Sequence, residues 1–228
     1  MVNKIDVLPC ENGEPGFVRL VDHMGNDLSI CRSARVSYNA DWRSDVNENN
    51  DIKLINYLWK NRHTSPFESV NFTFEVKAPI FVLRQWHRHR TWKYNEISAR
   101  YTELNEGFYV PEVDQITTQS KSNKQMRTGE IHPEASVIRS SILVACNEAF
   151  SVYREMIKKG CPRELARSVL PVSTYSRMFA TVDLHNLFHF LKLRLHEHAQ
   201  YEVRVYAEAM LKLIQPIVPV AVEAFQTN

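Results

Sequence analysis

The stretch VNFTFEVKAPIFVLRQWHRHR, residues 70–90, joins two hydrophobic periodicities. Its first part alternates between apolar and polar side chains, and this period of two is typical of a half-buried strand. The apolar positions are Val70, Phe72, Phe74 and Val76. Pro79 suits the first position of a helix. The helix predicted to follow it leads into a basic segment. The stretch therefore predicts a strand followed at once by a helix.

Helical patterns lie on both sides of this stretch. Residues 51–62 place apolar side chains on one face behind Asp51, a residue suited to capping a helix. From Pro133 a long amphipathic helix is predicted to run to Gly160, a residue that suits the position after a helix. Asp183 can cap a last long helical region. Because strand and helix patterns intermingle along the chain, the sequence predicts an α+β fold.

The segment 113–132 is polar and has no periodicity. At about twenty residues it is longer than a usual connection, so we expect a flexible loop of the kind that often serves as a lid. No internal repeat and no linker is visible elsewhere in the sequence. We therefore expect residues 1–228 to form a single domain, which a chain of this length can stabilise with one core.

The bulk composition excludes several classes of protein. A net charge of +2 is too low for a general nucleic-acid binder, so any anion site must be local. The four cysteines form no CxxC pair, which argues against a zinc ribbon or a disulfide scaffold. The sequence shows no secretory leader and no apolar run of membrane-spanning length. We expect a cytoplasmic protein.

The segment RHRTWKYNEISAR, residues 88–100, concentrates positive charge. Arg88, Arg90 and Arg100 surround an Asn-Glu-x-Ser sequence and are separated by aromatic and polar residues rather than by further lysines. A guanidinium group is permanently charged, and its planar fork matches the geometry of a phosphate. One such arginine alone is typical of a solvated surface, but the three together indicate a phosphate site.

The segment DLHNLFHFLKLRLHEHAQYE, residues 183–202, carries a second basic group. Its Leu and Phe positions follow the helical period and predict a side that faces the core. His185 and His189 are four residues apart, and Arg194 and His198 repeat that spacing. Four such groups on one helix repel one another unless something anionic or electron-rich faces them. A solvated helix face is the alternative.

Other signatures are absent or weak. The chain has no GxGxxG, P-loop, HExxH or GxSxG sequence. The His87/His89 pair is spaced by two residues, which does not place both rings on one helical face, and no convergent Cys or Asp ligands accompany it. We therefore expect no metal site. A third basic pair, Arg163 and Arg167, lies on a short helix between two prolines.

The basic segment closely resembles the signature of the flavin-dependent thymidylate synthases. Their pattern is Arg-His-Arg, two residues, Ser, one residue, Asn-Glu, one residue, Ser, one residue, Arg. The matching residues are Arg88, His89, Arg90, Asn95, Glu96, Ser98 and Arg100. Lys93 replaces the first serine of the pattern, so we give position 93 no catalytic role. HTSPFE, PRELARSVLP and DLHNLFHFLKLRLHEHAQYE also resemble family segments in family order, and the resemblance covers most of residues 17–214.

The resemblance implies a reaction and a fold. The family methylates dUMP to dTMP, with 5,10-methylenetetrahydrofolate as carbon donor and NADPH as reductant through FAD. Its fold is α+β, with a twisted, mainly antiparallel sheet and flanking helices. It assembles as a homotetramer with active sites where subunits meet, and it needs neither nucleic acid nor a membrane as partner.

The resemblance also implies site residues. The dUMP site takes Gln85, Arg88, Ser98, Ala99, Arg100, Arg167 and Arg194. The FAD site takes Ser65, Arg88, His89, Arg90, Glu96, Asp183, His185 and His189, with His63 near the flavin and the folate. Arg194 is expected to be catalytic, because a fixed guanidinium can stabilise negative charge that develops on the uracil ring. In this interpretation His89 and Arg90 meet anionic groups of the flavin nucleotide.

Two further expectations follow from the residues. Cysteine-dependent thymidylate synthases attack dUMP with a thiolate, but no cysteine lies in the arginine segment here, so we expect no covalent adduct. Trp86, Trp92, Phe188 and Tyr201 indicate contacts with neighbouring subunits, with plain core packing as the alternative. A rival function is an RNA-binding or regulatory module that uses residues 88–100 for phosphates and base stacking.

Overall fold

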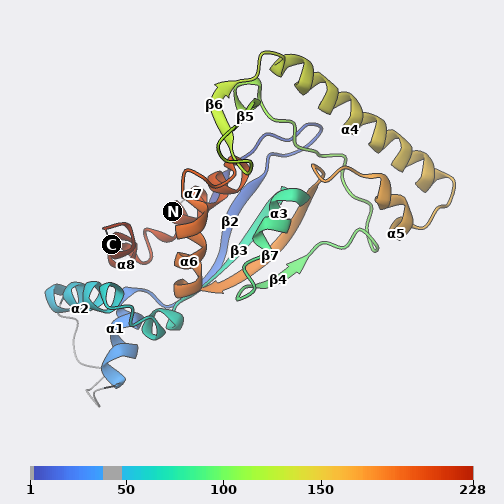
Figure 1. Cartoon of the computed structure of the whole chain (residues 1–228). Helices are drawn as coiled ribbons and strands as arrows, with labels where there is room; N and C mark the ends of the chain where they lie inside the picture. Colours follow the sequence, from blue (N-terminus) through green and yellow to red (C-terminus); the bar gives the residue numbers. More distant parts are fainter. Residues whose placement is uncertain (1–2, 38–47, 228) are drawn as a thin grey trace.

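The structure, a computed structural model, describes residues 3–37 and 48–227. A five-stranded antiparallel sheet forms its centre, in the order β1-β2-β3-β7-β4 (Figure 1). The strands span β1 Lys4–Asp6, β2 Phe17–Met24, β3 Asn71–Pro79, β4 Lys93–Glu96 and β7 Tyr175–Asp183. The predicted α+β class, with an antiparallel sheet and flanking helices, is confirmed.

Strand β3 lies in the middle of the sheet, and its alternation confirms the predicted period of two. Phe72, Phe74 and Val76 have no exposed surface, so one face of the sheet belongs to the core. The opposite face is more polar, and there Thr73 Oγ1 lies 3.0 Å from Thr181 Oγ1 of β7. Helix α3 (Ile80–Trp86) follows β3 directly, as the sequence predicts.

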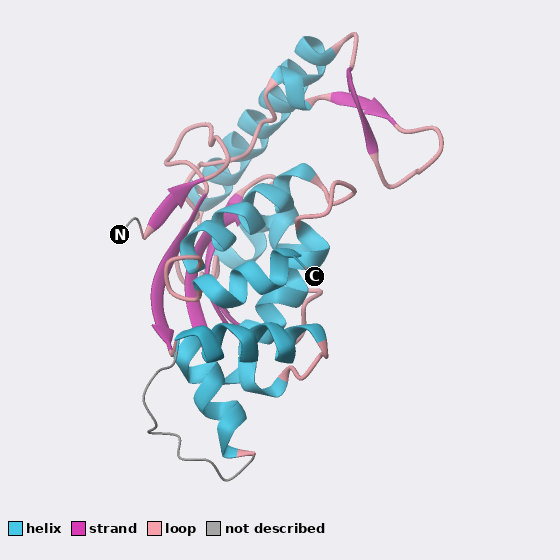
Figure 2. Ribbon diagram, turned by 90° about the vertical axis from the view of Figure 1, so that its left-hand side faces the viewer, coloured by secondary structure: helices cyan, strands magenta, loops and turns pink. Residues whose placement is uncertain are grey.

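Helices α3, α6 (Leu184–Arg194) and α7 (Tyr201–Ile214) cover the apolar face of the sheet (Figure 2). Trp86 packs on Phe190 with ring centroids 4.8 Å apart. Trp86, Trp92 and Phe188 are all buried inside this one chain. For these three rings the inference of contacts with neighbouring subunits is wrong and core packing holds, whereas Tyr201 is only half-buried and its assignment stays a prediction.

A second group of helices packs against α6 and α7. It comprises α1 (Asp27–Val36), α2 (Glu48–Lys60), the short η1 (Ser65–Ser69) and α8 (Pro219–Thr227). The Trp59 ring of α2 meets the Phe188 ring of α6 at 5.2 Å and the Phe225 ring of α8 at 5.9 Å. These edge contacts fix the C-terminal end of α2 against α6.

The last helical region is interrupted, contrary to the sequence interpretation. Helix α6 ends at Arg194, and α7 begins only at Tyr201. Between them His196 Nδ1 accepts a hydrogen bond from the backbone N–H of His198 at 3.1 Å. Such a local hydrogen bond between a side chain and the backbone competes with the backbone hydrogen bonds of a helix. Arg194 and His198 therefore do not share one helical face.

The segment 113–132 is partly ordered into a hairpin of β5 (Thr117–Gln119) and β6 (Arg127–Ile131), after the short η2 (Val113–Gln115). Arg127 Nη2 donates to both carboxylate oxygens of Glu202 at 3.1 Å, and Glu202 is only 3% exposed. The Tyr109 hydroxyl donates to the same carboxylate at 3.2 Å. The segment is therefore not a loop throughout, because long-range contacts hold this hairpin against α7, while its flexibility stays a prediction.

Helix α4 (Ala135–Lys158) confirms the long amphipathic helix predicted from Pro133 to Gly160. It packs on a small apolar cluster of its own, which includes Phe108, Phe150 and Tyr153. The short α5 (Arg163–Ala166) and η3 (Arg167–Val169) follow it and lie far from α6 in Figure 1. Among the described residues, no helix is both long and apolar enough to cross a membrane.

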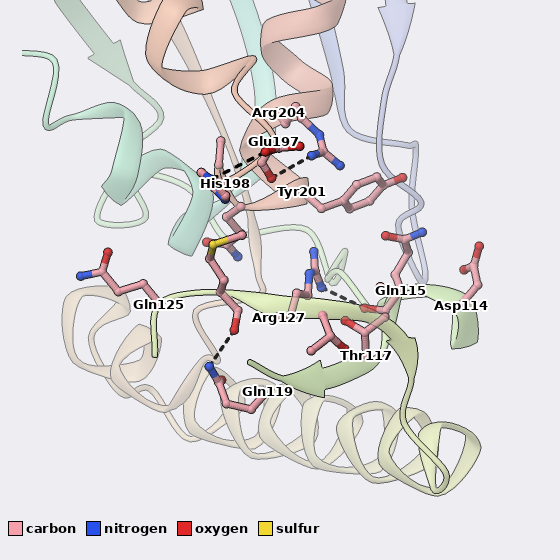
Figure 3. Close-up of a pocket in the computed structure, with 15 residues that line it drawn as sticks. Asp114, Gln115, Thr117, Gln119, Gln125, Arg127, Glu197, His198, Tyr201 and Arg204 are labelled. Carbon is pink, nitrogen blue, oxygen red and sulfur yellow. Dashed lines mark hydrogen bonds and ion pairs between the residues drawn. The ribbon is translucent and has the colours of Figure 1, made fainter. Parts of the chain in front are cut away.

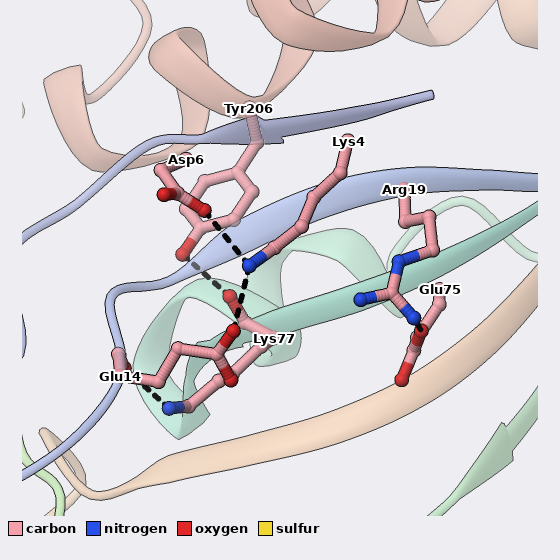
Figure 4. A network of polar contacts seen from close by, with 7 residues as sticks. All are labelled: Lys4, Asp6, Glu14, Arg19, Glu75, Lys77 and Tyr206. Atoms are coloured by element: carbon pink, nitrogen blue, oxygen red, sulfur yellow. Dashed lines mark hydrogen bonds and ion pairs between the residues drawn. The ribbon is translucent and has the colours of Figure 1, made fainter. Parts of the chain in front are cut away.

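Charged side chains near the edge of the sheet form ion pairs with one another (Figure 4). Lys4 of β1 lies 2.6 Å from Glu14 and 3.2 Å from Asp6, and Arg19 of β2 lies 2.9 Å from Glu75 of β3. Ion pairs of this kind, partly exposed to water, contribute little to stability. Their charges do make the edge strand a poor template for pairing with another sheet.

Candidate active site

Arg194 is the most informative residue of the site. Its Nε donates to Nε2 of His89 at 3.0 Å, and its Nη2 donates to the backbone carbonyl of Gln85 at 3.3 Å. Burial lowers the pKa of the Arg194 guanidinium from its ordinary value. Within the described part of the chain no carboxylate pairs with it. A half-buried cation without an acidic partner is suited to meet an anion or a developing negative charge.

Gln85, another predicted dUMP residue, lies next to Arg194 through its backbone carbonyl. Its side-chain amide also donates to the amide oxygen of Gln200, which precedes α7. Sequence reasoning did not single out Gln200. The two glutamines lie far apart in the chain and share no motif, so only the packing of α3 against α7 brings them together.

His89 is buried, with 8% of its surface exposed. Burial disfavours the charged imidazole, and the nearby Arg194 and His189 add to this, so its pKa falls to about 4. The ring is therefore neutral near pH 7. Nε2 of His89 already accepts the Nε–H of Arg194, and the expectation that His89 meets an anionic flavin group stays a prediction. Its sequence neighbours Arg88 and Arg90 are exposed and remain free to do so.

A cationic cavity of about 310 Å³ lies between the end of α2 and helix α6. It is lined by Trp59, Lys60, Arg62, Thr64, His185, Phe188, His189 and Lys192. His185 and His189, predicted from the sequence, thus share one site, and the Nδ1 atom of His185 is buried there without a hydrogen-bond partner. Among the described residues that line the cavity there is no carboxylate. Such a donor set is suited to an anionic ligand that also carries an aromatic ring.

The chain leading into η1 borders this cavity. Arg62 has a left-handed backbone with φ of 57°, which is uncommon for a residue with a side chain. His63 follows with its ring 5.8 Å from that of Tyr57, and both His63 and Ser65 are exposed. The predicted positions therefore lie beside the cavity, but their side chains do not line it.

A third set of predicted residues meets elsewhere. Arg100 and Arg167 line a cleft of about 550 Å³ together with Pro162, Glu164 and Leu165. Arg100 Nε lies 3.4 Å from Glu164 Oε2, and this pair is largely exposed, so it holds Arg100 only weakly. Ser98 Oγ accepts the backbone N–H of Arg100 at 3.3 Å, while Ala99 is buried beneath the turn. The two arginines make this cleft suitable for a phosphate, which would compete with Glu164 for Arg100.

Comparison with known proteins identifies the family. Residues 19–220 match the family model described as thymidylate synthase complementing protein. Flavin-dependent thymidylate synthases of Treponema denticola and Thermus thermophilus are 48% and 49% identical to this chain. These alignments cover 94% of the chain and 80% and 77% of the two relatives. The chain belongs to the flavin-dependent thymidylate synthase family. It is therefore an enzyme of the methyl-transferring class.

A solved structure shares both the fold and much of the sequence. The UMP/dUMP methylase PolB from Streptomyces cacaoi, bound with 5-Br dUMP, aligns with a TM-score of 0.87 at 37% identity. The alignment covers 97% of this chain and 96% of that one. Membership of an enzyme family leaves the alternative of an RNA-binding module without support.

Two acidic residues that the resemblance assigns to the flavin already have partners within the chain. Asp183 caps α6, because its Oδ1 accepts the backbone N–H of Asn186 at 2.9 Å and its Oδ2 accepts the side-chain amide at 2.7 Å. Glu96 accepts the hydroxyl of Ser176 at 2.5 Å across β4 and β7. Both carboxylates therefore have structural roles whether or not they also bind a ligand.

Cysteine chemistry is disfavoured in this family member. All four cysteines are free thiols. Burial raises the pKa of the Cys31 thiol to about 12 and also raises that of Cys10, so neither is a thiolate near pH 7. No group of three or more His, Cys, Asp or Glu side chains in the described residues could hold a metal ion.

A cavity of about 570 Å³ that the sequence did not predict lies under the β5–β6 hairpin (Figure 3). Its walls come from the hairpin and from residues 197–204, and they are rich in amides and hydroxyls. Gln200 belongs to this wall and also bonds Gln85, so the cavity adjoins the surroundings of Arg194. The pinned hairpin forms one side of the space next to the candidate active site.

Proposed function

We propose that this enzyme converts dUMP to dTMP by reductive methylation. The carbon comes from 5,10-methylenetetrahydrofolate and the reducing equivalents come from NADPH through FAD. The observation that carries the proposal is the half-buried Arg194 guanidinium, tethered by His89 and Gln85 and without a carboxylate partner. Membership of the family and the likeness to a methylase bound with 5-Br dUMP support it.

In this proposal Arg194 acts on the uracil ring. Carbon C5 becomes nucleophilic when electron density moves into the ring, and this leaves negative charge at N3 or O4. The free N–H groups of Arg194 stabilise that charge by hydrogen bonds. Because the guanidinium is already held by His89 and Gln85, little reorganisation is needed at the moment of reaction.

The phosphate of dUMP is assigned to the turn at Ser98 and to the cleft of Arg100 and Arg167. The two guanidinium groups supply charge-assisted hydrogen bonds, and the Ser98 hydroxyl and the backbone of Ala99 supply neutral contacts. Arg88, whose side chain is exposed, is a further phosphate contact in this proposal. These groups bind the part of dUMP that does not react, so they contribute mainly to binding.

The residues of the cationic cavity fit a flavin nucleotide. Lys60, Arg62 and Lys192 offer charge for its phosphates, His185 lines the cavity, and Trp59 offers an aromatic surface. His189, Arg90, Ser65, Glu96 and Asp183 are the further contacts that we propose, with His63 on the folate side. When bound, the flavin supplies hydride transfer. The chain's own residues hold it and exclude water.

We further propose a homotetramer whose active sites are shared between subunits. Arg194 is not among the residues that line the cleft of Arg100 and Arg167, and among the described residues no hydrogen bond or ion pair joins Arg194 to either of these arginines. One dUMP molecule must contact both sets in this mechanism. Pairing the cleft of one chain with Arg194 of another meets that requirement.

The test is an omission experiment with purified enzyme. We expect the protein to bind flavin and to form dTMP only when dUMP, NADPH and methylenetetrahydrofolate are all present. A colourless protein that takes up no added FAD, or one that forms no dTMP from the full mixture, contradicts the proposed function.

A further inference from the structure

We propose that His89 is a positioning residue for Arg194 rather than a ligand of the flavin. Its Nε2 accepts a hydrogen bond from Arg194 Nε and thereby sets the plane of the guanidinium that faces the substrate. This inference rests on the proposed function, in which Arg194 stabilises negative charge on the uracil ring.

The hydrogen bonds of Arg194 show the consequence of this contact. An arginine has five N–H donors in a planar fork. The Nε–H is taken by His89 at 3.0 Å and one Nη2 hydrogen by the Gln85 carbonyl at 3.3 Å. The remaining three have no partner within the described residues. Two anchors fix the orientation of the plane, and the free donors are left for a ligand.

The His89 ring is itself held firmly. Its backbone N–H donates to the Trp86 carbonyl at 2.9 Å, and its own carbonyl accepts the Tyr94 hydroxyl at 2.9 Å. The ring packs edge-on against Phe190, with centroids 4.9 Å apart. His89 therefore presents Nε2 from a turn with little freedom, as a positioning group must.

The contact also defines the chemical state of the imidazole. Arginine Nε can only donate, so Nε2 of His89 must carry a lone pair and the proton must sit on Nδ1. The charged neighbours agree with this, because Arg194 and His189 are both basic and no carboxylate partner of His89 is present in the described structure. Since Nε2 is engaged by Arg194, it is not available to a flavin phosphate.

Three variants separate positioning from flavin binding. His89→Gln keeps an acceptor near the place of Nε2, whereas His89→Asn places its acceptor near Nδ1 and His89→Leu has none. The measurements are flavin content, reduction of the bound flavin by NADPH, dUMP affinity, and kcat for dTMP. We expect His89→Leu and His89→Asn to keep flavin and its reduction but to lose roughly tenfold to a hundredfold in kcat. His89→Gln should recover most of that loss.

The inference is overturned if folded His89→Leu loses its flavin, or if it turns over dUMP at the wild-type rate. Should His89→Leu fail to fold, the Gln and Asn variants decide, and equal kcat values for the two overturn it. In an Arg194→Ala background, His89→Leu should change the residual rate by less than about twofold. Wild-type enzyme that forms no dTMP would instead refute the proposed function. Failure of the inference about His89 and failure of the proposed function therefore give different results.

Discussion

At the scale of single residues, the free donors of Arg194 decide whether it serves catalysis or binding. Arg194→Ala removes the group that we propose stabilises the uracil charge but leaves the proposed phosphate cleft intact. We expect kcat for dTMP to fall roughly a hundredfold at saturating dUMP, the usual cost of losing one such donor. The bound flavin should still be reduced by NADPH. Steady-state kinetics with separate assays of reduction and methyl transfer check this.

Arg167→Ala is the matched control for that experiment. It removes a cation from the phosphate cleft, so it should raise the KM for dUMP far more than it lowers kcat. If Arg194→Ala shows the same pattern as Arg167→Ala, Arg194 is a binding residue and its catalytic assignment fails.

His89 makes stability depend on pH in a defined direction. Its pKa in the folded chain is about 4, below the ordinary 6.5, so between these values the unfolded chain binds more protons. Stability is therefore fully present above about pH 6.5 and is lost as the pH falls toward 4, by at most about 1.4 kcal/mol per pH unit. His89→Gln should lose less stability than wild type on acidification. Denaturant unfolding at fixed protein concentration measures this.

An identical pH dependence for wild type and His89→Gln would show that His89 is not held neutral in the folded enzyme.

At the scale of elements, the β5–β6 hairpin depends on one buried ion pair. Removing Arg127 leaves the Glu202 carboxylate buried with only the Tyr109 hydroxyl as partner. Breaking a buried pair typically costs 3–5 kcal/mol, and because the Arg127 side chain is 33% exposed we expect about 2–3 kcal/mol for Arg127→Leu. Limited proteolysis should then cut within 117–131 first. Lys124→Met, which removes an unpaired charge on the same hairpin, should change neither property.

The elements that the sequence predicts are those with local signals. Strand β3 and helix α4 follow from periodicity, and Asp183 caps α6 as its residue type indicates. The hairpin and the break after Arg194 were not predictable in the same way. The hairpin is pinned by Glu202, which lies far away in sequence, and the break depends on a local bond of His196 that leaves no periodic signal.

The residues of the candidate site divide in the same way, into those with a local sequence signal and those that only the fold brings together. The basic residues of the signature and of α6 were found because they lie in recognisable segments. Lys60, Arg62 and Lys192 were missed, because they come from two elements that meet only when Trp59 packs on Phe188. The protonation state of His89 could not be predicted from the sequence either. The charge of a histidine depends on its burial and neighbours, and neither is visible in the sequence.

At the scale of the whole molecule, the separation of the two arginine sites predicts complementation between chains. Arg167→Ala and Arg194→Ala chains, unfolded and reassembled together, should regain activity at roughly a quarter of the sites by random assortment. Each variant reassembled alone provides the control. No recovery in tetramers shown to be mixed would place both arginines of a site on the same chain.

The central claim is that this enzyme builds the methyl group of dTMP from a folate carbon. The most direct measurement supplies dUMP, FAD, NADPH and methylenetetrahydrofolate labelled at its methylene carbon, followed by mass spectrometry of the nucleotide and of the intact protein. The account predicts labelled dTMP and no nucleotide attached to the protein. Unlabelled dUMP recovered unchanged, or a covalent nucleotide–protein adduct trapped during turnover, would contradict it.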